Sequence, residues 1–114
     1  MELNYQVKQV SRSLIFEYSG KIGIKEAQEF TESLKEEVEK HSDYLEIAID
    51  CSSVLFIDSS GMGELINLYR WFKQKEKFFC VIGLSQELKT IIRLAKLNNL
   101  IPIFSKEEYH KRLG

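Results

Sequence analysis

Residues 54–61 run Val54-Leu55-Phe56-Ile57-Asp58-Ser59-Ser60-Gly61, and this stretch carries the strongest structural signal in the sequence. Its apolar half stops at an acid, two hydroxyls and a glycine, and a helical pattern of apolar residues begins at Met62. The two serines are therefore expected at the N-terminus of a helix, where unpaired backbone N–H groups converge. Those amides and the helix dipole favour negative charge, by about 0.3 to 1 kcal/mol at an exposed position. Such a site suits a phosphate that is bound or formed there.

Two interpretations of this stretch stay open. Asp and Ser are preferred N-caps of ordinary helices, so Asp58 or Ser59 can do no more than satisfy one or two backbone donors. If either residue caps the helix, Ser60 falls in the first turn, and Gly61 and Gly63 leave the backbone beside it uncrowded. Ser60 is then a hydroxyl that another protein can approach.

Length and charge limit what surrounds this site. The chain has 114 residues, which is the size of one domain and enough to bury about two-thirds of the surface of the unfolded chain. We therefore expect a single domain over residues 1–114, without a second catalytic domain. The formal net charge is −1 and acids and bases are interspersed, which argues against direct nucleic-acid binding through a basic face.

The sequence also predicts a cytoplasmic protein. Residues 1–19 alternate polar and apolar residues where a signal peptide would have an apolar core, and no run has the length of a membrane span. Cys51 and Cys80 lack metal-ligand spacing and are too few for a disulfide framework, so both are expected to be free thiols. No metal or cofactor is expected.

The first forty residues predict a hairpin and a helix. Apolar residues alternate with polar ones on either side of a polar turn at residues 11–13, which is typical of a β-hairpin with one solvent-exposed face. These apolar positions are Leu3, Tyr5, Val7, Leu14, Phe16 and Tyr18. Ser19-Gly20 ends the second strand, and from about Ile24 to Lys40 the apolar period becomes helical. The inward positions of this helix are Ala27, Phe30, Leu34 and Val38.

The remaining elements alternate between strand and helix. Residues 45–49 and 78–82 are short apolar runs, typical of strands covered on both sides. A helix from Ser60 to about Lys75 separates them and turns Met62, Leu65, Ile66, Tyr69 and Phe72 inward. Ser85 caps a third helix that turns Leu88, Ile91, Ile92 and Ala95 inward. Residues 101–104 form an edge strand marked by Pro102, and Ser105 with Glu108 makes the capping box of a last short helix.

This order of elements predicts an α/β fold. Strands that alternate with helices pair in parallel through right-handed crossovers, and the hairpin adds an antiparallel strand at one side. We expect a mixed sheet of about four to five strands flanked by about four helices. The loop at residues 51–61 would emerge at the carboxyl ends of the strands, where such sheets bind ligands and partners.

Three features of the sequence are shared with one known family. They are the hairpin, the segment Gly20-Lys21-Ile22-Gly23-Ile24 before a helix with Ala27, and above all the string Phe56-Ile57-Asp58-Ser59-Ser60-Gly61-Met62-Gly63. Over nearly its whole length the chain resembles the STAS domain of bacterial anti-sigma factor antagonists. In that family the serine just before the glycine, here Ser60, is phosphorylated by a partner that is both a serine kinase and an anti-sigma factor. The resemblance implies that the unphosphorylated chain binds this partner and frees a sigma factor for transcription, and that a serine phosphatase resets the switch.

One residue departs from the family pattern. The family usually has an acid in the loop before the first helix, in a Gly-x-Leu-Asp pattern, and this chain has Gly23 there. Glycine can serve a tight turn or a positive φ angle at this position. If the acid helps to orient the serine or the kinase's nucleotide, phosphorylation is slower or absent in this chain. The expected partner-binding surface consists of Gly23, Asp58, Ser59, Ser60, Gly61, Met62, Leu68 and Trp71.

The helical wheel places Leu68 and Trp71 on that surface. Leu68 falls at the margin of the apolar stripe, and Trp71 lies outside it, on the side of Glu64 and Lys75. An exposed tryptophan is unusual unless it contacts a partner. The alternative is that Trp71 packs beneath the C-terminal segment of the chain.

Two other classes of function compete with this interpretation. A serine at a strand-to-helix turn also occurs in hydrolases, but His41 and His110 do not follow the carboxyl end of a strand, so we expect no enzyme activity. A phosphate-binding P-loop is excluded because Glu64 stands where its lysine would be. A STAS domain can also serve a signalling scaffold or a membrane transport complex. The sequence leaves the oligomeric state open.

Overall fold

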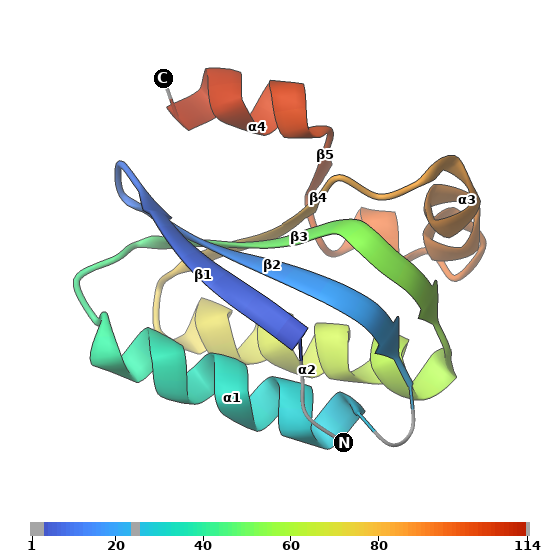
Figure 1. Cartoon of the computed structure of the whole chain (residues 1–114), viewed down its shortest axis with the longest axis horizontal. Helices are drawn as coiled ribbons and strands as arrows, with labels where there is room; N and C mark the ends of the chain where they lie inside the picture. Colours follow the sequence, from blue (N-terminus) through green and yellow to red (C-terminus); the bar gives the residue numbers. More distant parts are fainter. Residues whose placement is uncertain (1–3, 24–25, 114) are drawn as a thin grey trace.

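The computed structural model describes residues 4–23 and 26–113 of the chain. Its elements, in chain order, are β1 (Asn4–Val10), β2 (Ser13–Ile22), α1 (Ala27–Lys40), β3 (Glu46–Ile57), α2 (Ser59–Gln74), β4 (Phe78–Ile82), α3 (Gln86–Leu94), a 3-10 turn (Leu97–Asn99), β5 (Ile103–Phe104) and α4 (Lys106–Leu113) (Figure 1). The expectations for Leu3, for Ile24 and for the side chain of Ala27 fall outside the described part of the chain.

The described strands form one mixed sheet in the order β1-β2-β3-β4-β5. β1 and β2 pair antiparallel, with Tyr5 opposite Tyr18, and β2 to β5 pair in parallel. This arrangement confirms the predicted α/β sheet with an N-terminal hairpin. It also confirms the edge position of the last strand, although β5 begins only after Pro102.

Helices lie on both faces of the sheet (Figure 1), and the buried residues form two clusters. The larger cluster joins the sheet to α1, α2 and α3. The smaller one lies beneath α4 and consists of Ile15, Ala48, Cys80, Ile82 and Tyr109. The expectation that the whole hairpin has a solvent-exposed face is therefore wrong for β2, where α4 buries Ser13 and Ile15.

β3 is longer than the sequence predicts. Residues 51–57 were expected in a loop, but the strand continues to Ile57, and Leu45 lies outside it with 53% of its surface exposed. Beyond Asp50, β3 pairs with β2 while β4 has ended, and two register irregularities each insert one extra residue into β3. Such bulges bend a strand, so β3 carries Ile57 towards the start of α2. β2 likewise runs past Gly20, which has a φ of +102°, to Ile22.

The predicted capping residues do begin the later helices. The Leu88 N–H donates to Ser85 Oγ at 3.2 Å at the start of α3. In α4 the Ser105 N–H donates to Glu108 Oε1 at 2.7 Å and the Glu108 N–H donates to Ser105 Oγ at 3.0 Å, which completes the capping box. Ala95 is exposed and not inward, because α3 ends one residue earlier.

Candidate functional site

The carboxyl ends of β2 and β3 lie side by side, with Ile22 paired to Ile57, and both α1 and α2 begin at this edge of the sheet (Figure 1). The edge brings together six of the predicted partner-binding residues, Gly23 and residues 58–62, and we call it the serine edge. Ser59 is exposed, Asp58, Ser60 and Met62 are half-buried, and Gly23 and Gly61 are buried.

Asp58 is the N-cap of α2. Its Oδ1 accepts a hydrogen bond from the Gly61 N–H at 2.9 Å, and its carbonyl accepts the Met62 N–H at 2.9 Å. Ser60 therefore lies in the first turn, as one interpretation of the sequence required. Within the described part of the chain, no hydrogen bond to the Ser60 hydroxyl is formed, so capping does not use this oxygen.

Gly61 has a different role from the one expected. A Cβ at this position would lie 2.1 Å from the backbone oxygen of Ile22 and 3.0 Å from its Cγ2. Gly61 is therefore needed so that the start of α2 can pack against the end of β2, and it does not leave open space beside Ser60. Gly63 does match the expectation, because a Cβ there would have no atom within 4 Å.

Gly23 provides room for Asp58. A Cβ at position 23 would lie 3.0 Å from Asp58 Oδ2 and 3.4 Å from Glu26 Oε2. The Glu26 N–H donates to the Gly23 carbonyl at 3.1 Å, which closes a tight turn, and φ at Gly23 lies outside the left-handed region. Of the two explanations offered for this glycine, the tight turn is correct. An acid at this position would place a second carboxyl group against that of Asp58.

The structure corrects the placement of Leu68. Its side chain is 0% exposed and belongs to the main core, so it cannot contact a partner in this conformation. The helical wheel placed it at the margin because a wheel shows one buried stripe. In the fold α2 packs against both the sheet and α1, which widens its buried face.

The sequence predicted that Trp71 faces water, but its side chain is half-buried against the core. Its ring packs edge-to-face on Phe72 with centroids 5.0 Å apart, and the Nζ atoms of Lys35 and Lys75 lie 5.1 and 4.7 Å from its centroid. The alternative expectation is also wrong, because the C-terminal helix α4 lies on the opposite face of the sheet (Figure 1). Trp71 instead lies where α1 and α2 meet, under lysine side chains.

Sequence reasoning missed the position of Glu64. This residue lies one turn after Ser60 on α2, and its Oε2 accepts a hydrogen bond from Thr31 Oγ1 of α1 at 2.6 Å. The four-residue spacing from Ser60 was a visible signal that the two side chains share a helix face. The pairing with α1 could not be read from the sequence.

Neither histidine is placed to activate Ser60. His41 follows the C-terminal end of α1 and its ring packs against Tyr44 with centroids 6.0 Å apart. His110 lies on α4, across the sheet from α1 and α2 (Figure 1). Cys51 and Cys80 are free thiols, as predicted; both are also buried, and burial raises the pKa of each thiol to about 12. Thiols with such pKa values stay protonated at neutral pH and are poor nucleophiles.

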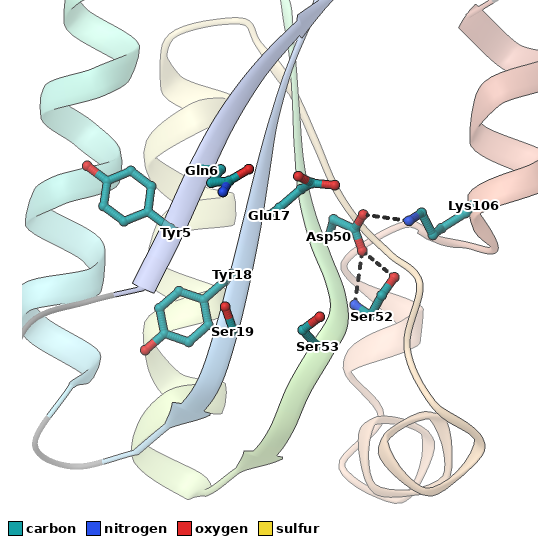
Figure 2. A pocket seen from close by; sticks show the side chains of 9 residues that line it. All are labelled: Tyr5, Gln6, Glu17, Tyr18, Ser19, Asp50, Ser52, Ser53 and Lys106. Atoms are coloured by element: carbon teal, nitrogen blue, oxygen red, sulfur yellow. Dashed lines mark hydrogen bonds and ion pairs between the residues drawn. The ribbon is translucent and has the colours of Figure 1, made fainter.

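A hollow of about 530 Å³ lies on the α4 side of the sheet (Figure 2). It is lined by Tyr5, Gln6, Glu17, Tyr18, Ser19, Asp50, Ser52, Ser53 and Lys106. Asp50 is 3% exposed, and its Oδ1 accepts hydrogen bonds from the N–H and the hydroxyl of Ser52 at 2.9 and 2.5 Å. Lys106 Nζ of α4 lies 3.2 Å from Asp50 Oδ2. The buried acid therefore ties the first bulge of β3 to the start of α4.

Removing the Lys106 charge should destabilise the protein in a pH-dependent way. Burial by itself would raise the pKa of Asp50, but the Ser52 hydrogen bonds and the Lys106 charge outweigh it and lower the pKa below its usual value. Ionised Asp50 therefore stabilises the fold above about pH 4, and this contribution is lost as the pH falls through the folded-state pKa. Because Lys106 is half-exposed, we expect Lys106→Ala to lower the free energy of unfolding by about 1 kcal/mol at pH 7.

Urea denaturation between pH 7 and pH 2.5 measures this effect. The difference between Lys106→Ala and the unmodified protein should shrink as Asp50 becomes protonated. Lys111→Ala is the control, since Lys111 is exposed on the same helix. A loss for Lys106→Ala that is the same at every pH would contradict the role given to Asp50.

The described helices include none that is both long enough and apolar enough to cross a membrane.

In a comparison with protein families, residues 4–110 match the STAS domain. Solved structures with a similar fold include a Thermotoga maritima protein assigned as an anti-sigma factor antagonist, at 21% identity and a TM-score of 0.84, over 96% of this chain and 93% of that one. A sulfate transporter family protein from Wolinella succinogenes is 17% identical, with a TM-score of 0.73, over 93% of this chain and 91% of that one.

The structure of the Bacillus cell fate determinant SpoIIAA in its phosphorylated form is 14% identical, with a TM-score of 0.69. The match covers 97% of this chain and 100% of that one. At these identities, each likeness shows the fold alone. The family match, by contrast, spans nearly the whole sequence and includes the serine edge. The chain therefore belongs to the STAS domain family.

Proposed function

We propose that this chain is an anti-sigma factor antagonist that binds an anti-sigma factor with serine kinase activity and is switched off by phosphorylation of Ser60. The proposal depends chiefly on one observation at the serine edge. Asp58 caps α2, so the Ser60 hydroxyl in the first turn is not needed for the helix. The fold shared with an anti-sigma factor antagonist, and with SpoIIAA in a phosphorylated form, supports the proposal.

Phosphorylation would act through charge. A phosphate adds about 1.5 to 2 negative charges at neutral pH. The free chain tolerates this anion because Ser60 lies in the first turn of α2, where the helix dipole favours negative charge. A partner packed on the serine edge must instead remove water from the phosphate, and this desolvation opposes binding. Phosphorylation thus releases the partner, and a serine phosphatase restores binding.

The proposed contact surface is the serine edge and not the length of α2. Ser59 and Ser60 are its hydroxyls, whereas Leu68 is buried and the half-buried ring of Trp71 is already in contact with two lysine side chains. Gly23 contributes space but no carboxylate. If the acid that usually occupies this position helps phosphoryl transfer, phosphorylation of this chain is slow. We propose that the domain acts without a cofactor and without catalysis of its own.

A second candidate function is a STAS module in a signalling scaffold or a membrane transport complex. The likeness to the fold of the sulfate transporter family protein favours it. In that case Ser60 would remain unmodified, and the serine edge would only shape the start of α2.

Phosphorylation in vitro separates the two candidates. The purified chain is incubated with ATP and a kinase-type anti-sigma factor encoded next to its gene, and mass spectrometry locates the phosphate. We expect phosphate on Ser60 in the unmodified protein and in Ser59→Ala, but none in Ser60→Ala. A partner that binds the chain without modifying it, or that modifies Ser59, would contradict the proposal.

A further inference from the structure

Glu64 lies one turn after Ser60 on α2, and its carboxylate is hydrogen-bonded to α1. Residues four apart on a helix lie on the same face, with Cβ atoms about 5–6 Å apart. Glu64 is half-buried, and its Oε2 accepts the hydrogen bond from Thr31 Oγ1 at 2.6 Å. Thr31 is only 7% exposed. Glu64 therefore cannot turn towards solvent without breaking a contact between α1 and α2.

We propose that Glu64 is a positioning residue that moves when Ser60 becomes charged. Its hydrogen bond to Thr31 couples this movement to α1. The inference rests on the proposed phosphorylation of Ser60. A phosphate there faces a carboxylate one turn away, and like charges at this spacing repel. When Glu64 moves away, its hydrogen bond to Thr31 breaks and the packing of α1 on α2 loosens. A partner then meets a shifted start of α1 as well as a new charge.

A double-mutant cycle tests this coupling without any partner. Ser60→Asp is compared with its neutral counterpart Ser60→Asn, first with Glu64 present and then in the Glu64→Gln background. Glutamine keeps an oxygen that accepts the Thr31 hydrogen bond but carries no charge. The helix dipole favours aspartate over asparagine at position 60 in both backgrounds, so the coupling is read from the difference between the backgrounds. The ratio of the Ser60→Asp to the Ser60→Asn folding equilibrium constant should be about 1.4-fold to 2.3-fold lower with Glu64 present than in Glu64→Gln.

Thr31→Val provides the second arm, because it removes the hydroxyl and keeps the size of the side chain. In Thr31→Val, Glu64 is already free to move, so the effect of Ser60→Asp should be smaller than in the unmodified protein. NMR should show amide shift changes along α1 on Ser60→Asp only when both Glu64 and Thr31 are present. A purely structural role for Glu64 would change stability without this dependence on charge at position 60.

The outcomes separate this inference from the proposed function. If the Asp–Asn difference at position 60 is the same with Glu64 and with Glu64→Gln, the coupling is overturned, even where phosphorylation of Ser60 is observed. If the coupling is measured but no kinase partner modifies Ser60, the proposed function fails while the physical link from Ser60 to α1 stands.

Discussion

Replacing Gly61 with alanine is expected to lower the free energy of unfolding by about 3 kcal/mol. The new Cβ would lie 2.1 Å from the carbonyl oxygen of Ile22. That oxygen belongs to the backbone at the end of β2 and accepts the Asp58 N–H at 3.3 Å. It cannot move without separating the end of β2 from the N-cap of α2. Urea denaturation followed by circular dichroism measures the loss.

Gly63→Ala is the matched control for this experiment. Gly63 lies two residues further along α2, and nothing would contact its added Cβ within 4 Å. Alanine favours a helix over glycine by up to about 1 kcal/mol, so Gly63→Ala should stabilise the protein. The two substitutions therefore have opposite expected signs on one helix. A Gly61→Ala protein that is as stable as Gly63→Ala would show that the close approach of α2 to β2 is not required.

Ser60→Asp is expected to weaken binding of the kinase partner by about a hundredfold or more relative to Ser60→Ala. Both variants remove the hydroxyl, but only aspartate places a charge where the partner would exclude water. A penalty of about 2.8 kcal/mol is sufficient for a hundredfold loss, and burying an uncompensated charge in an interface reaches this size. Isothermal titration calorimetry with the partner identified by phosphorylation measures both affinities.

Ser59→Asp distinguishes position from overall charge. Ser59 is exposed and Ser60 is half-buried, so the same charge at Ser59 can remain in water at the margin of a contact. We expect Ser59→Asp to weaken binding by less than tenfold, since rim charges contribute little to affinity (about 1 kcal/mol or less). Equal losses for the two aspartate variants would mean that the partner responds to net charge and not to Ser60.

The sequence predicted elements well where one local signal controls them. Ser85 and the Ser105–Glu108 box begin helices because their side chains satisfy nearby backbone donors, which requires no knowledge of the rest of the fold. The end of β3 was mispredicted because two extra residues interrupt its alternation, and the polar pair Ser52–Ser53 then looks like a loop. Strand pairing with β2, which the sequence does not display, keeps this segment extended.

In the candidate site, too, the features set by local sequence were predicted and those set by distant segments were not. The string from Asp58 to Gly61 correctly predicted the cap and the position of Ser60 in the first turn, since both follow from local geometry. The surroundings of α2 could not be predicted in the same way. Leu68 is buried and Trp71 is half-buried because α1 packs beside α2, and Gly61 is needed because the Ile22 carbonyl approaches it. These are contacts between segments far apart in the chain.

The strands stand in the sheet in the same order as in the chain. Each strand therefore pairs with the next one to be synthesised. Closing the connection between two such strands costs little entropy, and the sheet can grow by one strand at a time. The hydrogen bond between Ser13 and Tyr109, at 2.6 Å, is different because it joins residues 96 positions apart. It can form only after α4 has been synthesised and has docked on the sheet, so this contact links the first hairpin directly to α4.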